Sequence, residues 1–127
     1  MGVTVKDRGS FVKMEAFLSG IMKKSYLKNA EKYASAVTID LSNHTPVVTG
    51  KTATSWYYDI TQYRDGITIE WGNVNTTESG IPIVVFIRYG HANADGTHTA
   101  PNDFVTPVVE QWFDVISDDV WKEVVAL

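Results

Sequence analysis

Apolar residues in segment 10–43 recur mostly at intervals of three and four positions. That spacing gathers them along one face of an α-helix and leaves lysine and glutamate on the other face. Ser10 can cap the first turn, and Pro46 disfavours a helix that continues much further. The pattern therefore predicts a long N-terminal helix over residues 10–43, broken or kinked at Gly20. The short polar segment 1–9 is expected to be a flexible arm.

Beyond Gly50 the pattern changes from helical spacing to alternation and continuous apolar runs. Segment 52–62 is rich in Thr, Trp, Tyr and Ile, which suit a half-buried pleated surface, and segment 67–71 alternates apolar and polar residues. The Asp-Gly pair within residues 64–66 is a strong signal for a tight turn between two antiparallel strands. Segment 81–90 is apolar at nearly every position, which predicts a third strand covered on both faces.

The remainder of the chain predicts a loop and a second helix. Residues 91–103 are polar and rich in turn-forming residues, and residues 104–127 return to helical spacing. The expected fold class is α+β, in which the long N-terminal helix precedes a small antiparallel sheet over residues 52–90. That sheet consists of the hairpin and the third strand, and the C-terminal helix is expected to pack on it.

Composition narrows the class of protein further. At 127 residues, with 44% hydrophobic and 20% charged residues, the chain has the size and make-up of one globular domain, residues 1–127. The absence of cysteine excludes disulfides and thiol chemistry and suits a reducing cytoplasm. The net charge of -4 argues against a protein that grips nucleic acid. No basic-then-apolar leader and no apolar run near the roughly 20 residues of a membrane span are present.

Candidate catalytic groups form no recognised constellation. His91 and His98, with Asp95 and Asp103, are ligand types for zinc or manganese, but they lie in one turn-rich segment without the spacing that fixes a metal on a helix. Ser55 could pair with His44 or His91, but the chain lacks the nucleophile elbow of serine hydrolases. We therefore expect no enzyme activity, no catalytic or metal-binding residue and no cofactor.

Aromatic residues are numerous beside segments that look exposed. A sheet this small is not expected to hide both faces and both edges within one subunit, which suggests burial against further copies of the chain. The alternative, that the aromatic residues simply fill a large core, stays open. We expect the loops 73–80 and 91–103 to reach neighbouring proteins, and the candidate interface residues are Tyr57, Trp71, Phe86, Tyr89, His91, Asp95 and His98.

Three segments of the chain resemble the small neck and tail-completion proteins of long-tailed bacteriophages, also called head-tail connector or minor tail proteins. The family shows a T-P-V-D-T-G-[RK]-L-x-x-S-W segment, then an aromatic-Gly pair, then a P-F-hydrophobic-x-P-A entry into the last helix. The sequence departs from this pattern at Val48, Thr52, Arg88 and Asp103. The matching residues are Thr45, Pro46, Val47, Thr49, Gly50, Lys51, Ser55, Trp56, Tyr89, Gly90, Phe104 and Pro107.

The resemblance implies a structural virion protein, assembled in the host cytoplasm, that forms a ring between head and tail. Its partners would be further copies of itself in a sixfold or twelvefold ring, and the adjacent connector and tail proteins. Genome DNA would pass through the lumen without specific binding, and no membrane would be involved. Two alternatives come from other classes: a small binding or regulatory module that uses the β-hairpin face, and a metal-dependent hydrolase that uses the loop histidines.

Overall fold

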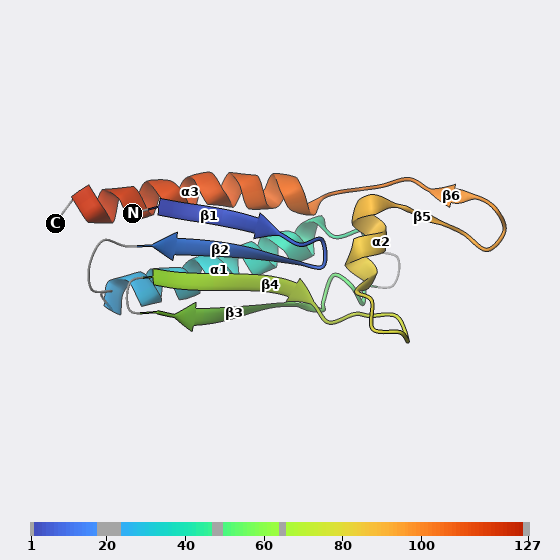
Figure 1. The fold of residues 1–127 in the computed structure, drawn as a ribbon, viewed down its shortest axis with the longest axis horizontal. Coiled ribbons are helices and arrows are strands. Elements are labelled where there is room, and N and C mark those ends of the chain that lie inside the picture. Colours follow the sequence, from blue (N-terminus) through green and yellow to red (C-terminus); the bar gives the residue numbers. More distant parts are fainter. Residues whose placement is uncertain (1, 18–23, 47–49, 64–65, 126–127) are drawn as a thin grey trace.

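The structure, a computed structural model, describes residues 2–17, 24–46, 50–63 and 66–125 (Figure 1). Two long helices cover one face of a four-stranded antiparallel sheet, and a short helix with a two-stranded arm lies at one end of the sheet. The strand order in the sheet is β1-β2-β4-β3. In chain order the elements are β1 (Gly2–Asp7), β2 (Phe11–Phe17), α1 (Lys24–His44), β3 (Trp56–Gln62), β4 (Gly66–Asn73), α2 (Ile83–Tyr89), β5 (His91–Ala92), β6 (His98–Thr99) and α3 (Val105–Val125).

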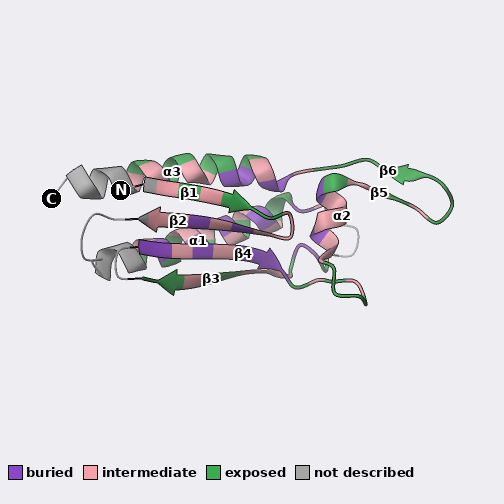
Figure 2. Cartoon of the chain, viewed as in Figure 1, coloured by how far each residue is buried: buried purple, intermediate pink, exposed green. Residues whose placement is uncertain are grey.

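The core lies between the sheet and the two long helices (Figure 2). Small residues along α1, such as Ala34 and Val37, let that helix approach the sheet closely, and both are fully buried. Trp71 on β4 is also fully buried, and its indole nitrogen donates a hydrogen bond to the Ala34 carbonyl at 3.1 Å. The opposite face of the sheet carries polar side chains such as Lys13 and Glu70, whose charged groups lie 3.7 Å apart.

The prediction of a helix over residues 10–43 is wrong in its first part. Residues 11–17 form β2, the helix begins at Lys24, and Gly20 lies outside the described residues. Val12 and Met14 are buried while Lys13 between them is not, which is the alternation of a strand. The three-residue spacing of the apolar side chains in so short a segment suits either element, and pairing on both sides with β1 and β4 makes it a strand.

Residues 1–9 are not the expected flexible arm, because residues 2–7 form β1 and pair with β2. Val3 and Val5 alternate with Thr4 and Lys6, and the two valines are the less exposed residues. Gly9, with φ at 85°, occupies the turn that returns the chain into β2. A hairpin therefore precedes the long helix, and that helix is not the N-terminal element of the fold.

The third predicted strand, over residues 81–90, is also wrong, because Ile83–Tyr89 form the short helix α2. A run of about seven apolar residues does not distinguish a strand from a buried helical turn. Val84 and Arg88, four positions apart, are its buried residues, as helical geometry requires. The segment 91–103 is not wholly loop, since it contains β5 and β6. The sheet is thus completed by the N-terminal hairpin and not by residues from 81 onward.

Two predicted elements are confirmed. Strands β3 and β4 pair antiparallel, with Tyr58 opposite Trp71 and Ile60 opposite Ile69, although residues 64–65 of their turn lie outside the described part. The C-terminal helix is α3, and its buried residues belong to the same core as the sheet. Among the helices of the described residues, none has the length and hydropathy needed to cross a membrane.

The alternation along β2 can be tested by two adjacent substitutions. Val12→Asp places a carboxylate in the core, and we expect it to lower the free energy of unfolding by about 3–5 kcal/mol because the charge has no partner there. Lys13→Asn, on the other face, removes one partly exposed ion pair and is expected to cost about 0.2–1 kcal/mol. Denaturant unfolding measures both, and equal effects would contradict the strand alternation.

Candidate functional site

Thr45 and Trp56, from the first segment that resembles the neck proteins, and Phe104, from the third, meet at one junction. Thr45, directly after α1, is buried, and its hydroxyl donates to the Leu41 carbonyl at 2.7 Å. The same hydroxyl accepts a hydrogen bond from the Trp56 indole nitrogen at 2.8 Å. The Trp56 ring packs edge-to-face on Phe104, with 6.2 Å between ring centroids. These residues therefore join the end of α1, the start of β3 and the entry into α3.

Residues 50–55, which precede Trp56, form a turn whose polar groups bond to its own backbone. Gly50 has φ at 80°, a conformation that side chains disfavour, and its carbonyl accepts from both the amide and the hydroxyl of Thr54. The Ser55 hydroxyl donates to the Lys51 carbonyl. The serine, glycine and lysine of the recognised segment thus shape the entry into β3.

The other positions of the recognised segments have varied surroundings. Pro46 is half-buried, Pro107 is exposed in the first turn of α3, and residues 47–49, which include Val47 and Thr49, lie outside the described residues. Gly90 ends α2 with φ at 75°, and a Cβ there would lie 2.6 Å from the Thr99 carbonyl oxygen. Only glycine therefore fits between α2 and the end of β6.

Neither histidine proposed as a base is paired with Ser55. The Nδ1 atom of His44 lies 3.1 Å from a carboxylate oxygen of Asp40 in the same helix. The ring of His91 packs edge-to-face on Phe86, with 5.8 Å between centroids. The three groups are used in separate local contacts and form no nucleophile-base arrangement.

Of the residues considered as metal ligands, His91, Asp95 and His98 lie along the arm formed by residues 91–99, whereas Asp103 lies beyond it and pairs with Arg88. Asp95 accepts hydrogen bonds from the amide and hydroxyl of Thr97, and His98 is exposed on β6. The described residues contain no group of three or more His, Cys, Asp or Glu side chains placed to hold a metal ion. The hydrogen bonds from the hydroxyl and amide of Thr97 lower the pKa of Asp95 below its usual range.

The four aromatic residues considered for an interface differ in exposure. Trp71 is fully buried, so it contributes to the core of its own chain. Tyr57 is half-buried on the outer face of the sheet, and its ring lies against Gly72 on β4. Phe86 is half-buried on α2, whereas Tyr89 is 54% exposed. Tyr89 is therefore the one of these four that is most accessible to a partner.

Sequence reasoning missed a buried charge cluster centred on Arg88. Its side chain is only 1% exposed, and its guanidinium reaches two carboxylates. Nε donates to Asp103 at 2.8 Å, and Nη1 and Nη2 donate to the two carboxylate oxygens of Asp7. Nη1 also donates to the Gly9 carbonyl at 2.9 Å, and Nη2 lies 3.3 Å from the Thr106 hydroxyl. We call these five residues the Arg88 cluster.

The electrostatics of the cluster follow from burial and pairing. Burial works to lower the pKa of Arg88, but its hydrogen bonds to Asp7 and Asp103 prevail and raise it. The hydrogen bond from Arg88 lowers the pKa of Asp7. Burial works to raise the pKa of Asp103, but hydrogen bonds from Arg88 and Thr106 outweigh it, so that this pKa is also lowered. All three groups are therefore held in their charged forms at neutral pH.

A signal for this cluster was present in the sequence. Arg88 is the one charged residue in the apolar segment 81–89, and such a residue within a packed helix requires a partner. Asp103 stands three residues before Thr106, at the position from which a side chain caps a helix, and it accepts from the Thr106 amide. The partner Asp7 could not be inferred, because the hairpin that carries it was not predicted.

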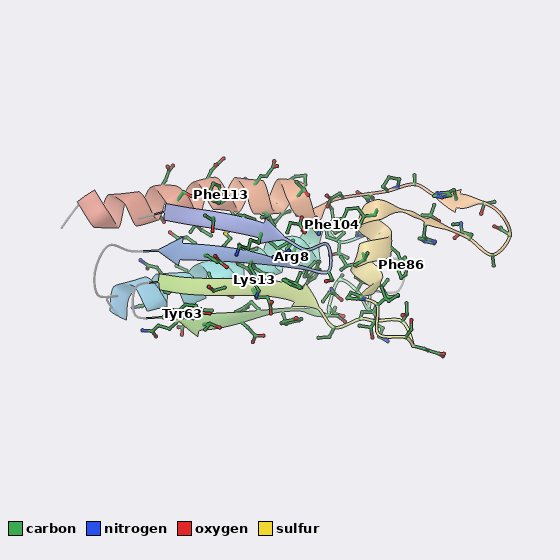
Figure 3. All side chains as sticks on the ribbon, viewed as in Figure 1. Arg8, Lys13, Tyr63, Phe86, Phe104 and Phe113 are labelled. Carbon is green, nitrogen blue, oxygen red and sulfur yellow. The ribbon has the colours of Figure 1, made fainter. Side chains whose placement is uncertain are left out.

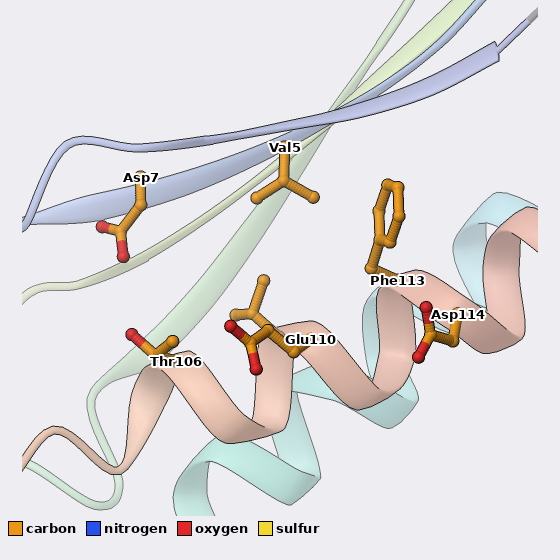
Figure 4. Close-up of a pocket in the computed structure, with 7 residues that line it drawn as sticks. Val5, Asp7, Thr106, Glu110, Phe113 and Asp114 are labelled. Carbon is orange, nitrogen blue, oxygen red and sulfur yellow. The ribbon is translucent and has the colours of Figure 1, made fainter.

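A groove of about 470 Å³ runs between β1 and α3 (Figure 4). Val5 on β1 and Phe113 on α3 point into it, as Figure 4 shows. Acidic side chains surround this apolar floor, so a ligand there would combine apolar and basic or neutral polar groups. The complete lining is Val5, Asp7, Thr106, Val109, Glu110, Phe113 and Asp114.

Comparison of the chain with protein-family models, with characterised proteins and with solved structures gives no match in any of the three.

Removal of the central cation should strongly destabilise the fold. Arg88→Ala leaves Asp7 and Asp103 without their partner, and we expect the free energy of unfolding to fall by about 3–5 kcal/mol. Arg8→Ala is the matched control, because Arg8 is exposed on the neighbouring turn (Figure 3), and it should change stability by less than about 0.5 kcal/mol. A small effect of Arg88→Ala in denaturant unfolding would contradict the assigned role.

The cluster should also make stability depend on acid pH. Because the pKa values of Asp7 and Asp103 are lowered in the folded state, their stabilisation is complete above their unfolded values and is lost as pH falls through the folded ones. We expect the wild-type Tm to decrease once the pH is lowered beneath about 4. The difference in Tm between the wild type and the Asp7→Asn variant should shrink from pH 7 to pH 3. At low pH the wild type loses the charge of Asp7, which the variant lacks at every pH. A difference independent of pH would refute this linkage.

Proposed function

We propose that this chain is a structural subunit of the neck of a long-tailed bacteriophage. Several copies form a ring between the head and the tail, contact the adjacent connector and tail proteins, and leave a passage for the genome. The resemblance of three sequence segments to the neck and tail-completion family supports this proposal. The junction of Thr45, Trp56 and Phe104 supports it further, because residues from two of these segments, far apart in the sequence, pack against each other.

The observation that carries the proposal is the arm formed by residues 91–99. It extends beyond α2, away from the sheet and the long helices (Figure 1). Its shape is set by internal hydrogen bonds, since the Asn93 amide donates to the Thr97 carbonyl at 2.8 Å and the Asn93 side chain reaches the Thr97 and Thr99 hydroxyls. A preformed polar arm loses little conformational entropy on binding, which suits contact with a neighbouring ring.

The charge of the chain is consistent with DNA in transit. A net charge of -4 gives no general attraction for phosphate, so a ring of such subunits would not hold the genome in place. Contacts with protein neighbours would instead come from shape and polar complementarity at the arm and at the subunit edges.

Genetic complementation in the phage that encodes this chain tests the proposal. We expect the subunit in purified virions, and we expect particles lacking it to be filled heads without attached tails by electron microscopy. Replacement of residues 93–98 by Gly-Gly should leave the Tm of the subunit nearly unchanged but abolish tail attachment. Glu31→Ala, an exposed change on α1, is the control and should complement fully. Absence of the protein from virions, or full complementation by the armless variant, would contradict the proposal.

A further inference from the structure

Within the part of the chain that the structure describes, the sheet has two open edges, formed by β1 and β3 at the ends of the strand order. At the β1 edge, the Arg8 amide donates to the Phe11 carbonyl at 2.9 Å, so Arg8 and Phe11 form one of the hydrogen-bonded pairs of the β1-β2 ladder. Hydrogen bonding alternates along an antiparallel ladder, so the backbone groups of Val3, Val5 and Asp7 point away from β2. These residues present a row of donors and acceptors to a further strand.

The β3 edge is complementary in its pattern. The Tyr63 amide donates to the Gly66 carbonyl at 2.8 Å, and alternation then directs the backbone groups of Tyr58, Ile60 and Gln62 away from β4. On both edges the residues with free backbone groups are those on the helix-covered face, because they pair in register with core positions of β2 and β4. Joining the two edges would therefore match both hydrogen bonds and faces.

Strand direction permits that joining between copies in the same orientation. Each neighbour in the order β1-β2-β4-β3 is antiparallel to the next, so β1 and β3 run in opposite directions. When a second copy is placed beside the first without being inverted, its β1 meets β3 of the first copy as an antiparallel partner. This is a head-to-tail contact, which closes into a ring when the rotation between copies allows it.

Charges on the outer face also complement each other across these edges. One row contains Lys6 opposite Lys13 and Asp59 opposite Glu70, so it is positive towards β1 and negative towards β3. Like charges directly opposite each other destabilise a sheet. Lys13 reaches Glu70 in the adjacent strand, whereas Asp59 makes no ion pair within the described residues. Lys6 lies 3.4 Å from Glu15 of its own chain, but its side chain is half-exposed. A second copy with Lys6 opposite Asp59 would therefore bring a cation within reach of that unpaired carboxylate.

The groove between β1 and α3 adds apolar surface to the same edge. Helix α3 flanks β1 so that Val5 and Phe113 remain accessible beside the edge strand (Figure 4). On β3, Tyr58 faces the helix side but is 39% exposed, because no strand of the described residues lies beyond it. With Lys6 opposite Asp59, Ile60 falls opposite Val5 and Tyr58 opposite Asp7, so both apolar side chains would cover the groove.

We propose that β3 of one copy pairs antiparallel with β1 of the next copy, with Lys6 opposite Asp59, Val5 opposite Ile60 and Thr4 opposite Thr61. The sheets of adjacent copies then continue as one sheet around the assembly. The closure of these contacts into a ring rests on the proposed function. The strand pairing itself is inferred from the sheet edges, strand directions and charges of this chain.

A disulfide between copies tests the register directly. Thr4 and Thr61 are exposed on the outer face and would form a non-hydrogen-bonded pair, in which Cβ atoms are about 4.5–5.5 Å apart. Within one chain the two positions are separated by β2 and β4, about 14 Å at ordinary strand spacing, which is too far for a disulfide. The chain has no cysteine of its own, so the variant carrying Thr4→Cys and Thr61→Cys reports only contacts between copies.

We expect mild oxidation of this double variant to give a ladder of covalent oligomers larger than dimers on non-reducing gels. Each single variant can give dimers at most. The control variant with Thr4→Cys and Thr68→Cys has its second cysteine on the outer face of the interior strand β4, and it should give no ladder. A ladder from the control, or none from the test variant, overturns the proposed register.

Charge reversal tests the pairing without cysteine. Lys6→Glu and Asp59→Lys should each lower the association constant by about tenfold in light scattering, and the two changes together should restore it. Lys32→Glu and Glu78→Lys, exposed and outside the sheet, are matched controls that should have little effect. Equal loss in the double-reversal variant would contradict a direct Lys6-Asp59 contact.

The outcomes separate this inference from the proposed function. Rings that form without the ladder would overturn the strand pairing and leave the neck function standing. A ladder from a protein that is absent from virions would support the pairing and contradict the neck function. A chain that stays monomeric at high concentration, with no ladder, overturns the pairing, and the virion experiment then decides the function alone.

Discussion

The buried guanidinium of Arg88 is the interaction on which the arrangement of the chain depends. Its Nε and terminal nitrogens donate to Asp7, Gly9, Asp103 and the hydroxyl of Thr106, so the donor groups of a fully buried cation are satisfied. A charge removed from water is strongly unfavourable unless it is paired, and here its partners come from β1, the β1-β2 turn and the start of α3. These segments must therefore assemble together.

This requirement also positions the parts of the molecule that are open to partners. Arg88 lies on α2, whose end leads through Gly90 into the projecting arm, and the Asn102 amide donates to the Ile87 carbonyl where the arm returns. Asp7 is the last residue of the open edge strand β1. The same cluster thus anchors the base of the arm and one edge of the sheet, and it couples the stability of both to the core.

The segments that carry the family resemblance have a structural explanation in this chain. Thr45, Trp56 and Phe104 form the junction between α1, β3 and α3, and Gly90 occupies a position where any Cβ would meet backbone. Such positions are restricted by packing and backbone geometry. In this chain, therefore, Thr45, Trp56, Phe104 and Gly90 contribute to packing and backbone geometry.

Local sequence determined the elements whose signals are self-contained. The β3-β4 hairpin follows from alternation around an Asp-Gly pair, and α3 follows from a helical period sustained over 21 residues. Most of α1 was predicted for the same reason. These signals arise from neighbours along the chain, so they can be read without knowledge of the tertiary structure.

Tertiary structure decided the elements whose local pattern was ambiguous. Residues 11–17 form a strand because β1 and β4 lie on either side, and residues 83–89 form a helix although their composition favours a strand. The ion pair between Arg88 and Asp7 joins positions 81 residues apart, and no local pattern specifies such a partner. In the unfolded chain, the backbone and charged groups of each segment bond to water. In the folded chain they bond to partners from distant segments, and only the assembled fold determines which partner each group has.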